Sequence, residues 1–593
     1  MELRQGAISL SATDLVGHHD CHHLTNLERA VALGSLERPQ SWSPLAALLS
    51  ERGDAHEKAF VEHLVGSGVE VVRVEGRGIE PEAVRRTLAL MEAGVPSIVQ
   101  GALSNGRWGG RADVLWRVDS PSRFGNWSYE AIDAKLSRLT KGNTLLQRSL
   151  YSDLIADAQG AAPESMQVVT PWTDFVPERY RVNDYAAYFR LIKSRLLAAV
   201  DNDLSQTYPE PNSHCELCRW RYPCDARRRA DDHLCFVAGI SKLQVSELAG
   251  HDIRTTAELA AMPLPLEWKP DRGAVEPYER VREQARLQVQ ARNSGQPVFE
   301  ILPREPGFGL ARLPEPSLGD IFFDLEGDPF IGLGGCEYLF GYLFTDDQGK
   351  ETYRADWALT RAEERAAFEA FIDFVMKRLV RYPDLHIYHF ARYEPSAVRR
   401  LMGRHATRED EVDRLLRAKV FVDLYPISKR AIRASVESYS IKNLEQFCGF
   451  QRTVDLDDAN RHLAIVQSGL ESGDVGAIPK ETLTAVAGYN RDDCASALAL
   501  RDWLEGLRAG LIEGGEEILR PPIESGDASE AVSARQVAVR ELMDRLMVDV
   551  PIDKEDRDAR PNKPFGPWPM SLIGTVARTR SSGGNIFGSA ILT

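Results

Sequence analysis

The spacing of apolar positions divides the chain into regions of different pattern. Up to about residue 235, strand-like alternation and helical periodicity follow one another, which predicts a mixed α/β region. Residues 236–300 show helical periodicity alone. This pattern predicts two short amphipathic helices around Gly250, followed by a longer polar helix over 277–293.

A second mixed pattern begins at Ile321, after a Pro/Gly-rich stretch over 302–320 that predicts a linker. Strand and helix patterns alternate from there to about residue 505. Residues 506–593 are less regular: a helix is predicted over 531–547, and the end of the chain has the composition of an unstructured tail. We therefore expect a multidomain α/β protein.

Composition and charge exclude several classes of protein. Hydrophobic residues make up 43% of the 593 residues, which provides for several cores and excludes a mostly disordered chain. The 87 acidic and 72 basic residues give a net charge of −15, unlike the overall basic charge of a histone-like binder. No apolar run approaches the ~18–20 residues of a membrane helix, and the N-terminus lacks a signal-peptide pattern. We expect a cytoplasmic protein with no membrane partner.

Two short segments of the first region carry residue types found in metal-dependent phosphodiester hydrolysis. Asp113 begins an apolar stretch, and Asp133 and Lys135 stand two apart in a strand-like run, so that both share one face. Two carboxylates on neighbouring strands can hold a divalent cation through oxygen ligands. A lysine beside them can position the attacking water and stabilise the charge that develops on phosphorus. An Asp-x-Lys alone is common by chance.

Three further residues complete an ordered set. His56 lies on a predicted helix upstream, and Gln147 and Tyr151 stand at i and i+4 on one helix face downstream. In this order, with the two aspartates and the lysine between them, the residues resemble the RecB-family nucleases of the PD-(D/E)xK superfamily. The resemblance implies metal binding by His56, Asp113 and Asp133, and catalysis by Lys135, Gln147 and Tyr151.

The eight cysteines are unevenly distributed. Cys215, Cys218 and Cys224 are crowded into ten residues C-terminal to these motifs, and Cys21 lies N-terminal to them. This arrangement resembles RecB-like exonucleases that carry an iron–sulfur cluster, such as AddB-type subunits and the RecB-like nucleases associated with CRISPR. Four thiolates suit the [4Fe–4S] cluster that the resemblance implies, and they also suit structural Zn²⁺.

The second α/β region begins with a strand that carries two acids on one face. Asp324 and Glu326 alternate with apolar residues in IFFDLEGDPF, whose Ile and Phe content predicts burial. Burying two acids is costly unless something compensates, and a pair of metal ions is the simplest compensation. Two further strands, a helix and another strand follow, which is the β-β-β-α-β order of an RNase H-like fold.

A helix near the end of this region supplies another pair of residues. Tyr489 and Asp493 stand at i and i+4 and share a face. With the Asp-x-Glu strand they resemble the DEDD exonucleases that have a tyrosine in the last motif. The resemblance is closer to the YprB-type RNase H-like domain, which SYSIKNLEQFCGF and YNRDDCASAL also fit. It implies two Mg²⁺ or Mn²⁺ ions held by Asp324, Glu326 and Asp493, with Tyr489 orienting the water.

The second acidic motif departs from the usual pattern of these exonucleases. An aspartate is usual there, whereas this chain has Glu394, whose longer side chain could still reach a metal ion. Asp423 is an alternative ligand, although a strand-end acid or a helix cap is an equally simple interpretation. This departure leaves open an RNase H-like domain that binds nucleic acid without cleaving it.

These observations predict a DNA nuclease of repair or processing, with two metal-dependent centres and exonucleolytic action on single-stranded ends. A nucleic-acid-binding scaffold and an RNA-directed nuclease remain the alternatives. RecB-like and YprB-like parts in this order resemble a bacterial and archaeal family whose longer members continue into a superfamily 1 helicase. This chain contains no G-x-x-x-x-G-K-[ST] motif, so we expect a separate helicase chain as a partner or a truncated end.

The expected domains follow from these resemblances and from the apolar pattern. The helical pair over 240–262 resembles a helix-hairpin-helix, which would contact a phosphate backbone, and a plain helical connector fits equally well. The domains are a RecB-like PD-(D/E)xK (restriction-endonuclease-like) domain with its cysteine cluster over 1–235, the helical connector over 236–300, an RNase H-like DEDD domain over 317–505, and a helical and poorly structured, truncated end over 506–593.

Overall fold

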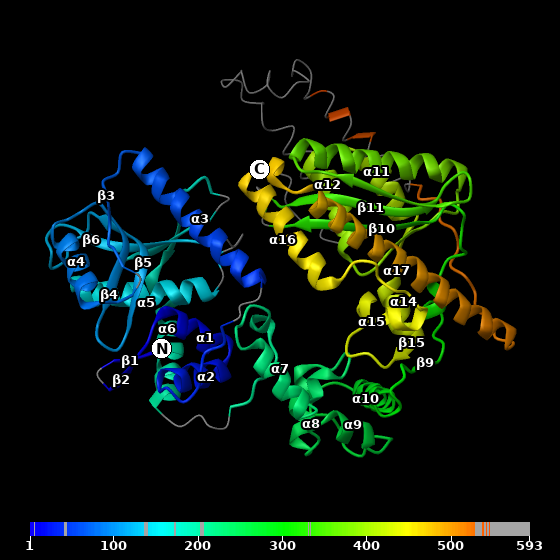
Figure 1. The fold of residues 1–593 in the computed structure, drawn as a ribbon, viewed down its shortest axis with the longest axis horizontal. Helices are drawn as coiled ribbons and strands as arrows, with labels where there is room; N and C mark the ends of the chain where they lie inside the picture. The colour runs from blue at the N-terminus through cyan, green and yellow to red at the C-terminus, as the bar shows by residue number, and fades with distance from the viewer. Residues whose placement is uncertain are drawn as a thin grey trace. The chain divides into compact units, whose positions relative to one another are not determined.

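The chain folds into two compact units, which are drawn as a ribbon in Figure 1. The N-terminal unit comprises residues 1–233 and 330–335, and the C-terminal unit comprises residues 234–329 and the described residues from 336 onward. The helix predicted over 531–547 falls almost wholly outside the described residues. This computed structural model describes residues 1–527 except 5, 41–43, 77, 136–139, 141, 171–172, 202–206, 330 and 332–333, together with residues 537–538, 541–542 and 545.

A mixed six-stranded sheet forms the centre of the N-terminal unit. Its strands are β3 (Val71–Arg73), β4 (Ser97–Ser104), β5 (Gly109–Val118), β6 (Ser128–Ala134), β7 (Ser165–Val169) and β8 (Glu178–Arg181). They lie in the same order across the sheet. Pairs β4–β5, β5–β6 and β7–β8 are antiparallel, whereas β3–β4 and β6–β7 are parallel. A ribbon of β1 (Glu2–Arg4) and β2 (Ala7–Ser9) precedes the sheet in the chain.

Helices cover both faces of this sheet. The helices of this unit are α1 (Ala12–Asp20), α2 (His22–Ala32), α3 (Pro44–Gly66), α4 (Pro81–Glu92), α5 (Gly142–Gln159), α6 (Val182–Asp201) and α7 (Arg221–Ala230), with the 3₁₀-helix η1 (Ser213–Glu216). On one face Phe60 of α3 packs with Val114 and Ile132. On the other face Leu150 of α5 belongs to the same cluster as Leu115. Because successive residues of β5 point to opposite faces, Val114 and Leu115 enter the two cores in turn.

The C-terminal unit begins with a small helical layer. It contains η2 (Leu234–Phe236), α8 (Lys242–Gly250), α9 (Thr256–Ala261) and α10 (Glu276–Ser294). Ser241 and Thr255 begin the two short helices with capping boxes, in which the cap side chain and the third helical residue exchange hydrogen bonds. Leu248, Leu259 and Val281 share a small core. Two short helices and a longer one are the elements that the pattern predicts, and their helix-hairpin-helix role stays a prediction.

A five-stranded mixed sheet forms the centre of the C-terminal unit. Its strands are β10 (Ile321–Asp328), β11 (Cys336–Thr345), β12 (Glu351–Trp357), β13 (Ile387–His389) and β14 (Phe421–Asp423). Across the sheet the order is β12-β11-β10-β13-β14. Strands β10–β11 and β11–β12 pair antiparallel, and β13 is parallel to both of its neighbours. This is a mixed sheet consistent with an RNase H-like fold, and its first elements follow the predicted β-β-β-α-β order.

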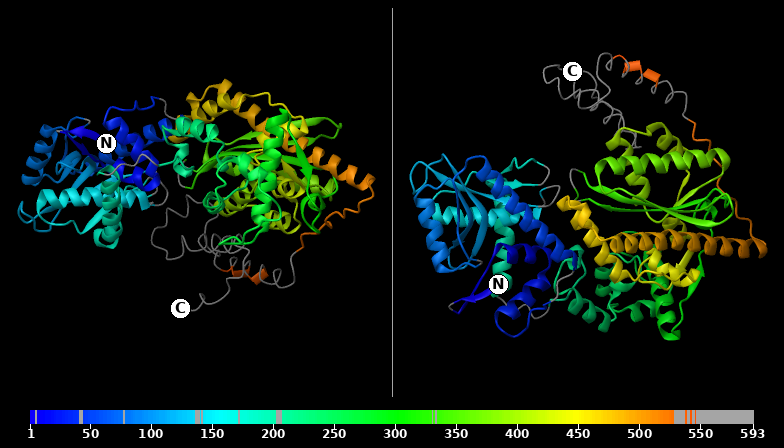
Figure 2. Two further views of the ribbon diagram at one scale, coloured as in Figure 1. Left: turned by 90° about the horizontal axis from the view of Figure 1, so that it is seen from below. Right: turned by 45° about the horizontal axis from the view of Figure 1, so that its top comes forward.

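Helices pack on the two faces of this sheet (Figure 2). The helices of this part of the unit are α11 (Arg361–Arg381), α12 (Tyr393–His405), α13 (Glu409–Arg417), α14 (Leu424–Ala431), α15 (Ile441–Cys448), α16 (Leu456–Ser472) and α17 (Lys480–Glu513), with η4 (Val475–Ala477). Phe323 faces α11, where its ring centroid lies 4.1 Å from that of Phe371. Phe322 faces the other side and shares a core with Leu500 of α17. Successive side chains of β10 therefore enter the cores on opposite faces of the sheet, as those of β5 do in the N-terminal unit.

The Pro/Gly-rich stretch predicted as a linker is partly packed. It contains η3 (Gly309–Arg312), and its Leu310 and Leu313 are buried in the α17 core. A short sheet of β9 (Phe299–Ile301) and β15 (Ile432–Ala434) lies next to it in the chain. The apolar residues between the prolines pack into this core, which the Pro/Gly-rich composition did not predict.

The stacked pair of phenylalanines predicts the stability of the α11 face. Phe371→Ala should lower the free energy of unfolding of the C-terminal unit by about 3–5 kcal/mol, because it leaves a cavity in a buried core. Val380→Ala on the same helix is the matched control, since Val380 is 84% exposed, and its effect should stay within about 0.5 kcal/mol. Urea denaturation followed by tryptophan fluorescence measures both. Equal effects would contradict the packing of α11 on the sheet.

Candidate metal centres

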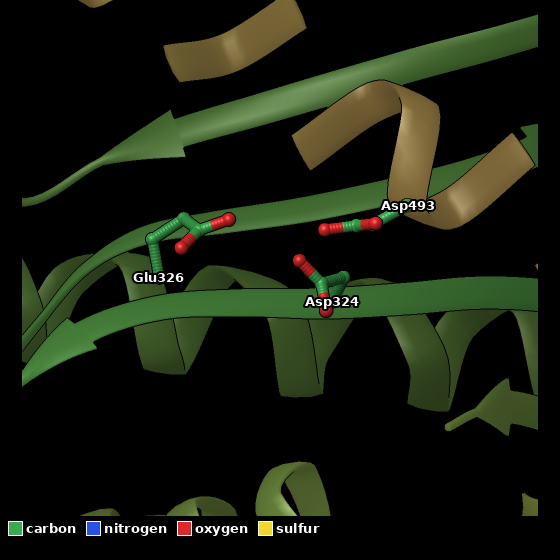
Figure 3. A group of neighbouring side chains, drawn as sticks. All are labelled: Asp324, Glu326 and Asp493. Carbon is green, nitrogen blue, oxygen red and sulfur yellow. The ribbon is translucent and has the colours of Figure 1, made fainter. Parts of the chain in front are cut away.

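Three carboxylates of the C-terminal unit converge on one point. Asp324 and Glu326 come from β10 and Asp493 comes from α17, and one oxygen of each lies within 4.8 Å of the others. Figure 3 shows the three side chains turned toward one another. Within the described part of the chain, this is the one group of three or more histidine, cysteine or acidic side chains with ligand atoms this close.

The local fold explains why these residues meet. Asp324 and Glu326 alternate with Phe323 and Leu325, so the two acids point to the face that α17 covers. On α17, Asp493 lies in the same stretch as Ala497, which packs into that face. A register shift follows Glu326 in the pairing with β11, and such irregularities commonly re-aim side chains beside functional sites.

Asn490 is a member of this site that the sequence analysis did not identify. Its side chain is fully buried, and its amide nitrogen donates to Asp324 Oδ2 at 2.7 Å and to Glu326 Oε1 at 3.4 Å. Its carbonyl oxygen accepts a hydrogen bond from the Tyr353 hydroxyl at 2.9 Å. Gly341 makes room for it, because a Cβ there would lie 1.5 Å from Asn490 Oδ1. Gly341 was the signal available in the sequence, because a glycine inside a buried strand often marks the close approach of another group.

Burial and neighbouring negative charges raise the pKa of Asp324 and of Glu326. The pKa of Asp324 lies well above its usual value because the side chain is desolvated and because Asp493 and Glu326 repel its negative charge. Burial and the charge of Asp493 raise the pKa of Glu326 to about 8, against the hydrogen bond from Asn490. A divalent cation bound by oxygen ligands would remove this repulsion, so the residues fit Mg²⁺ or a similar ion.

An arginine holds the carboxylate of Asp493. Arg452 Nη2 donates to Asp493 Oδ1 at 2.5 Å and to Glu445 Oε1 at 2.6 Å, while Arg452 Nε donates to Glu445 Oε2. The Ser496 hydroxyl donates to the same Glu445 carboxylate at 2.8 Å. This chain of charge-assisted hydrogen bonds fixes the position of Asp493.

Tyr489 lies beside the triad and is bonded to a lysine. Lys442 Nζ donates to Tyr489 Oη at 2.7 Å and lies 4.9 Å from the ring centroid. Burial raises the pKa of Tyr489, and the charges of Asp493, Glu326 and Asp324 raise it further. The phenol therefore stays protonated. The i, i+4 spacing identifies Tyr489, whereas Lys442, within the SYSIKNLEQFCGF segment, carries no local signal of its role.

Glu394 lies near the triad but outside the 4.8 Å group. It is buried on the first turn of α12, and its Oε2 is 3.3 Å from His389 Nδ1. Burial raises its pKa, and the His389 side chain acts against the shift. Asp423 caps α14 and accepts hydrogen bonds from the backbone N–H groups of Tyr425 and Ala391. Metal binding by Glu394 stays a prediction.

In the N-terminal unit, the two predicted aspartates are cross-strand neighbours. Val114 pairs with Ile132, which places Asp113 of β5 opposite Asp133 of β6. Burial, the charge of Asp133 and a hydrogen bond between the two carboxyl groups raise the pKa of Asp113 well above its usual value. Lys135 Nζ lies 3.1 Å from Asp133 Oδ2, so three of the predicted residues are together.

Arg148 is the residue that sequence reasoning missed at this centre. It is fully buried on α5, and its Nη2 lies 2.8 Å from Asp133 Oδ1. Burial alone would raise the pKa of Asp133, but Arg148 and Lys135 outweigh it, and the pKa is lowered. The Arg148 guanidinium also lies 4.6 Å from the ring centroid of Tyr151, whose pKa burial raises to about 12. The helix periodicity offered no means of telling that this arginine points inward.

The other predicted residues of this unit lie as follows. Gln147 is a hydrogen-bond partner of the Tyr151 side chain, as an i, i+4 pair on α5 permits. His56 Nε2 lies 3.2 Å from the Val169 carbonyl oxygen, and its ring stacks on Phe175. Burial lowers the pKa of His56. Metal ligation by His56 stays a prediction.

The four predicted cysteine ligands line one small cavity of about 20 Å³. Cys21 caps α2, and the other three come from the segment over η1 and α7. Burial raises the pKa of Cys218, and it raises that of Cys224 to about 11, with neighbouring thiols adding to both shifts. No three of these sulfur atoms lie within 4.8 Å of one another, so they do not form a compact ion site.

One family comparison agrees with the acidic site. Residues 321–505, about a third of the chain, match the family RNase_H_2, described as RNase_H superfamily. The matched range contains the whole Asp324, Glu326 and Asp493 group. A comparison with curated proteins finds no match. The match and the acidic triad together indicate a metal-dependent nuclease with a nucleic-acid substrate. In the described part of the chain, no helix has the length and apolarity to cross a membrane.

The raised pKa of Glu326 predicts a link between pH, metal and stability. Without metal, Glu326 keeps its proton in the folded unit up to about pH 8, whereas in the unfolded chain it loses the proton above about pH 4.5. The protonated carboxyl therefore contributes stability that is complete below about pH 4.5. This contribution is lost as the pH rises through about 8. Added Mg²⁺ replaces the proton and should raise the melting temperature most on the alkaline side. Glu326→Gln should abolish this pH-dependent metal effect, whereas Glu351→Gln, an exposed control on β12, should keep it. The measurement is the melting temperature with and without Mg²⁺ over a range of pH. A stabilisation by Mg²⁺ that does not change with pH would contradict the assignment of Glu326 as a metal ligand.

Proposed function

We propose that the protein is a DNA nuclease that hydrolyses phosphodiester bonds at single-stranded ends, with Asp324, Glu326 and Asp493 as its principal metal ligands. The observation that carries this proposal is the convergence of the three carboxylates within the part of the chain that matches the RNase_H superfamily. Divalent ions bound there would stabilise the attacking and leaving oxygens of the displacement. A role in DNA repair or processing belongs to the same proposal.

The surrounding residues fit distinct tasks in such a reaction. Asn490 and Arg452 orient Asp324 and Asp493, so that their free oxygens face a common point. Tyr489 keeps its proton and can donate a hydrogen bond to the attacking water or to a phosphate oxygen, which would orient it. We assign Glu394 to the same centre as an outer ligand, held by His389 until substrate and metal bind.

We further propose a second, RecB-like centre in the N-terminal unit. The order α3-β4-β5-β6-α5-β7, the facing pair Asp113 and Asp133, and the nearby Lys135 support it. The Arg148 guanidinium forms an ion pair with the Asp133 carboxylate, but none of its three nitrogens makes a hydrogen bond of good geometry with the described part of the chain. Buried polar groups normally find partners, so these unused donors suit water or a phosphate oxygen.

We further propose that Cys21, Cys215, Cys218 and Cys224 bind a metal group. The four residues line one cavity, which supports a common ligand. Four thiolates suit structural Zn²⁺ or a [4Fe–4S] cluster, and the resemblance to RecB-like exonucleases favours the cluster. It would tie the start of α2 to the end of the unit.

A binding scaffold is the second candidate function. The specific observation in its favour is the ion pair between Arg148 and Asp133, which places a protein cation beside a predicted metal ligand. In a scaffold, one or both centres would bind nucleic acid without cleaving it, and a separate helicase chain would be the partner.

Cleavage of end-labelled strands tests the nuclease proposal. In Mn²⁺, the full chain should shorten single-stranded DNA, and Asp493→Ala should reduce the rate by about a hundredfold or more, because it removes charge stabilisation at the reacting phosphate. Any loss of cleavage in Lys135→Ala measures the separate contribution of the proposed N-terminal centre. Matched RNA strands distinguish an RNA-directed enzyme, which would cleave them faster. Tight DNA binding with no metal-dependent hydrolysis would establish the scaffold instead.

The cluster proposal is tested by absorbance and metal analysis. Anaerobically purified protein should be brown, with iron and acid-labile sulfide in equal amounts, and Cys218→Ser should lose both. Cys448→Ser is the matched control, since Cys448 lies on α15 of the other unit. If the protein is colourless and contains zinc, and if Cys218→Ser loses that zinc, the site is a zinc site and not an iron–sulfur cluster.

A further inference from the structure

Lys442 is placed where a substrate would meet the acidic site. Its side chain is exposed, and its ammonium donates to the hydroxyl of Tyr489, which lies beside the three carboxylates. Its positive charge acts against the raised pKa of both Asp324 and Glu326. The ammonium is therefore within electrostatic reach of the metal-binding oxygens but remains open to solvent.

The structure of α15 does not require a lysine there. Lys442 is the second residue of this helix, and a cation in the first turn is opposed by the helix dipole. No carboxylate pairs with it among the described residues, so no ion pair compensates for the position. Such a placement favours a role in binding over a role in stability.

Arg452 provides the contrast. It comes from the same stretch of chain, but its guanidinium is engaged by Glu445 and Asp493 and only 10% of its side chain is exposed. Arg452 therefore acts as a positioning group for Asp493. An ammonium has three protons to donate, and Tyr489 accepts one of those of Lys442, which leaves the others for an anion from solution.

We propose that Lys442 is a substrate-binding residue of the acidic site, whose ammonium contacts a phosphate of the nucleic-acid strand while it holds the Tyr489 hydroxyl as an acceptor. This inference rests on the proposed nuclease function and adds to it the group that draws the anionic strand to an acidic centre. Because Lys442 donates to Tyr489 Oη, the single phenolic proton points away from the lysine. That proton is then free for the water or phosphate oxygen at the metal ions.

Binding and cleavage by variants of the full chain test this contact. The parent carries Lys135→Ala, so that the cleavage measured comes from the acidic site. The probe is a phosphorothioate-protected, fluorescein-labelled oligothymidylate with Ca²⁺, titrated over a range of salt concentrations. Loss of one phosphate contact should lower the slope of log affinity against log salt by about 0.7 in Lys442→Met. Lys442→Arg should restore most of the slope, because the charge remains.

The matched controls separate this contact from general charge and from folding. Lys377→Met removes an exposed lysine on α11, on the other face of the sheet, and should leave the slope and the cleavage rate unchanged. Tyr489→Phe should keep the slope but lose cleavage, since it removes the hydroxyl and leaves the ammonium. Unprotected oligothymidylate with Mn²⁺ should be cleaved at least about tenfold more slowly by Lys442→Met than by the parent.

The outcomes distinguish this inference from the function on which it rests. A salt slope and affinity in Lys442→Met equal to those of the parent would overturn the inference, whether or not the protein cleaves. Cleavage in the parent that does not depend on Asp493 would refute the proposed function of the acidic site. The binding series would still decide whether Lys442 contacts phosphate.

Discussion

Mutual repulsion among buried carboxylates is the constraint around which the C-terminal unit is built. Asp324, Glu326 and Asp493 meet where a sheet face and a helix would otherwise bury apolar groups. The fold tolerates them because Asn490 donates to two of them and Arg452 neutralises the third. Compensation by the chain is incomplete, since the pKa of Glu326 remains near 8. A divalent cation would supply the compensation that the chain does not.

The acidic pair of the N-terminal unit meets the same constraint in another way. Asp113 and Asp133 face each other on neighbouring strands, where burial and the charge of Asp133 raise the pKa of Asp113. The C-terminal acids are compensated by an amide and an arginine, whereas the N-terminal pair is compensated by the guanidinium of Arg148 and the ammonium of Lys135.

Sequence reasoning reached the elements and acids of both centres through short-range patterns. Alternation in β10 placed Asp324 and Glu326 on one face, and i, i+4 spacing placed Tyr489 and Asp493 together on α17. Asn490, Arg452 and Arg148 were missed because their roles depend on which residue of a distant element faces them. The burial of Leu310 and Leu313 in the Pro/Gly-rich stretch was missed for a related reason, since composition does not tell what a loop packs against.

Helix α17 has a mechanical consequence for the C-terminal centre. It runs for 34 residues as one continuous rod, about 50 Å long, and a single stretch of it carries Tyr489, Asn490 and Asp493. Sliding the rod by one residue, about 1.5 Å, would displace all three groups at once. Leu500 and Leu504, further along the rod, anchor it in the core. The alignment of these groups with the carboxylates of β10 therefore depends on how the rod packs along its length, and a substitution that shifts this packing would affect all three groups together.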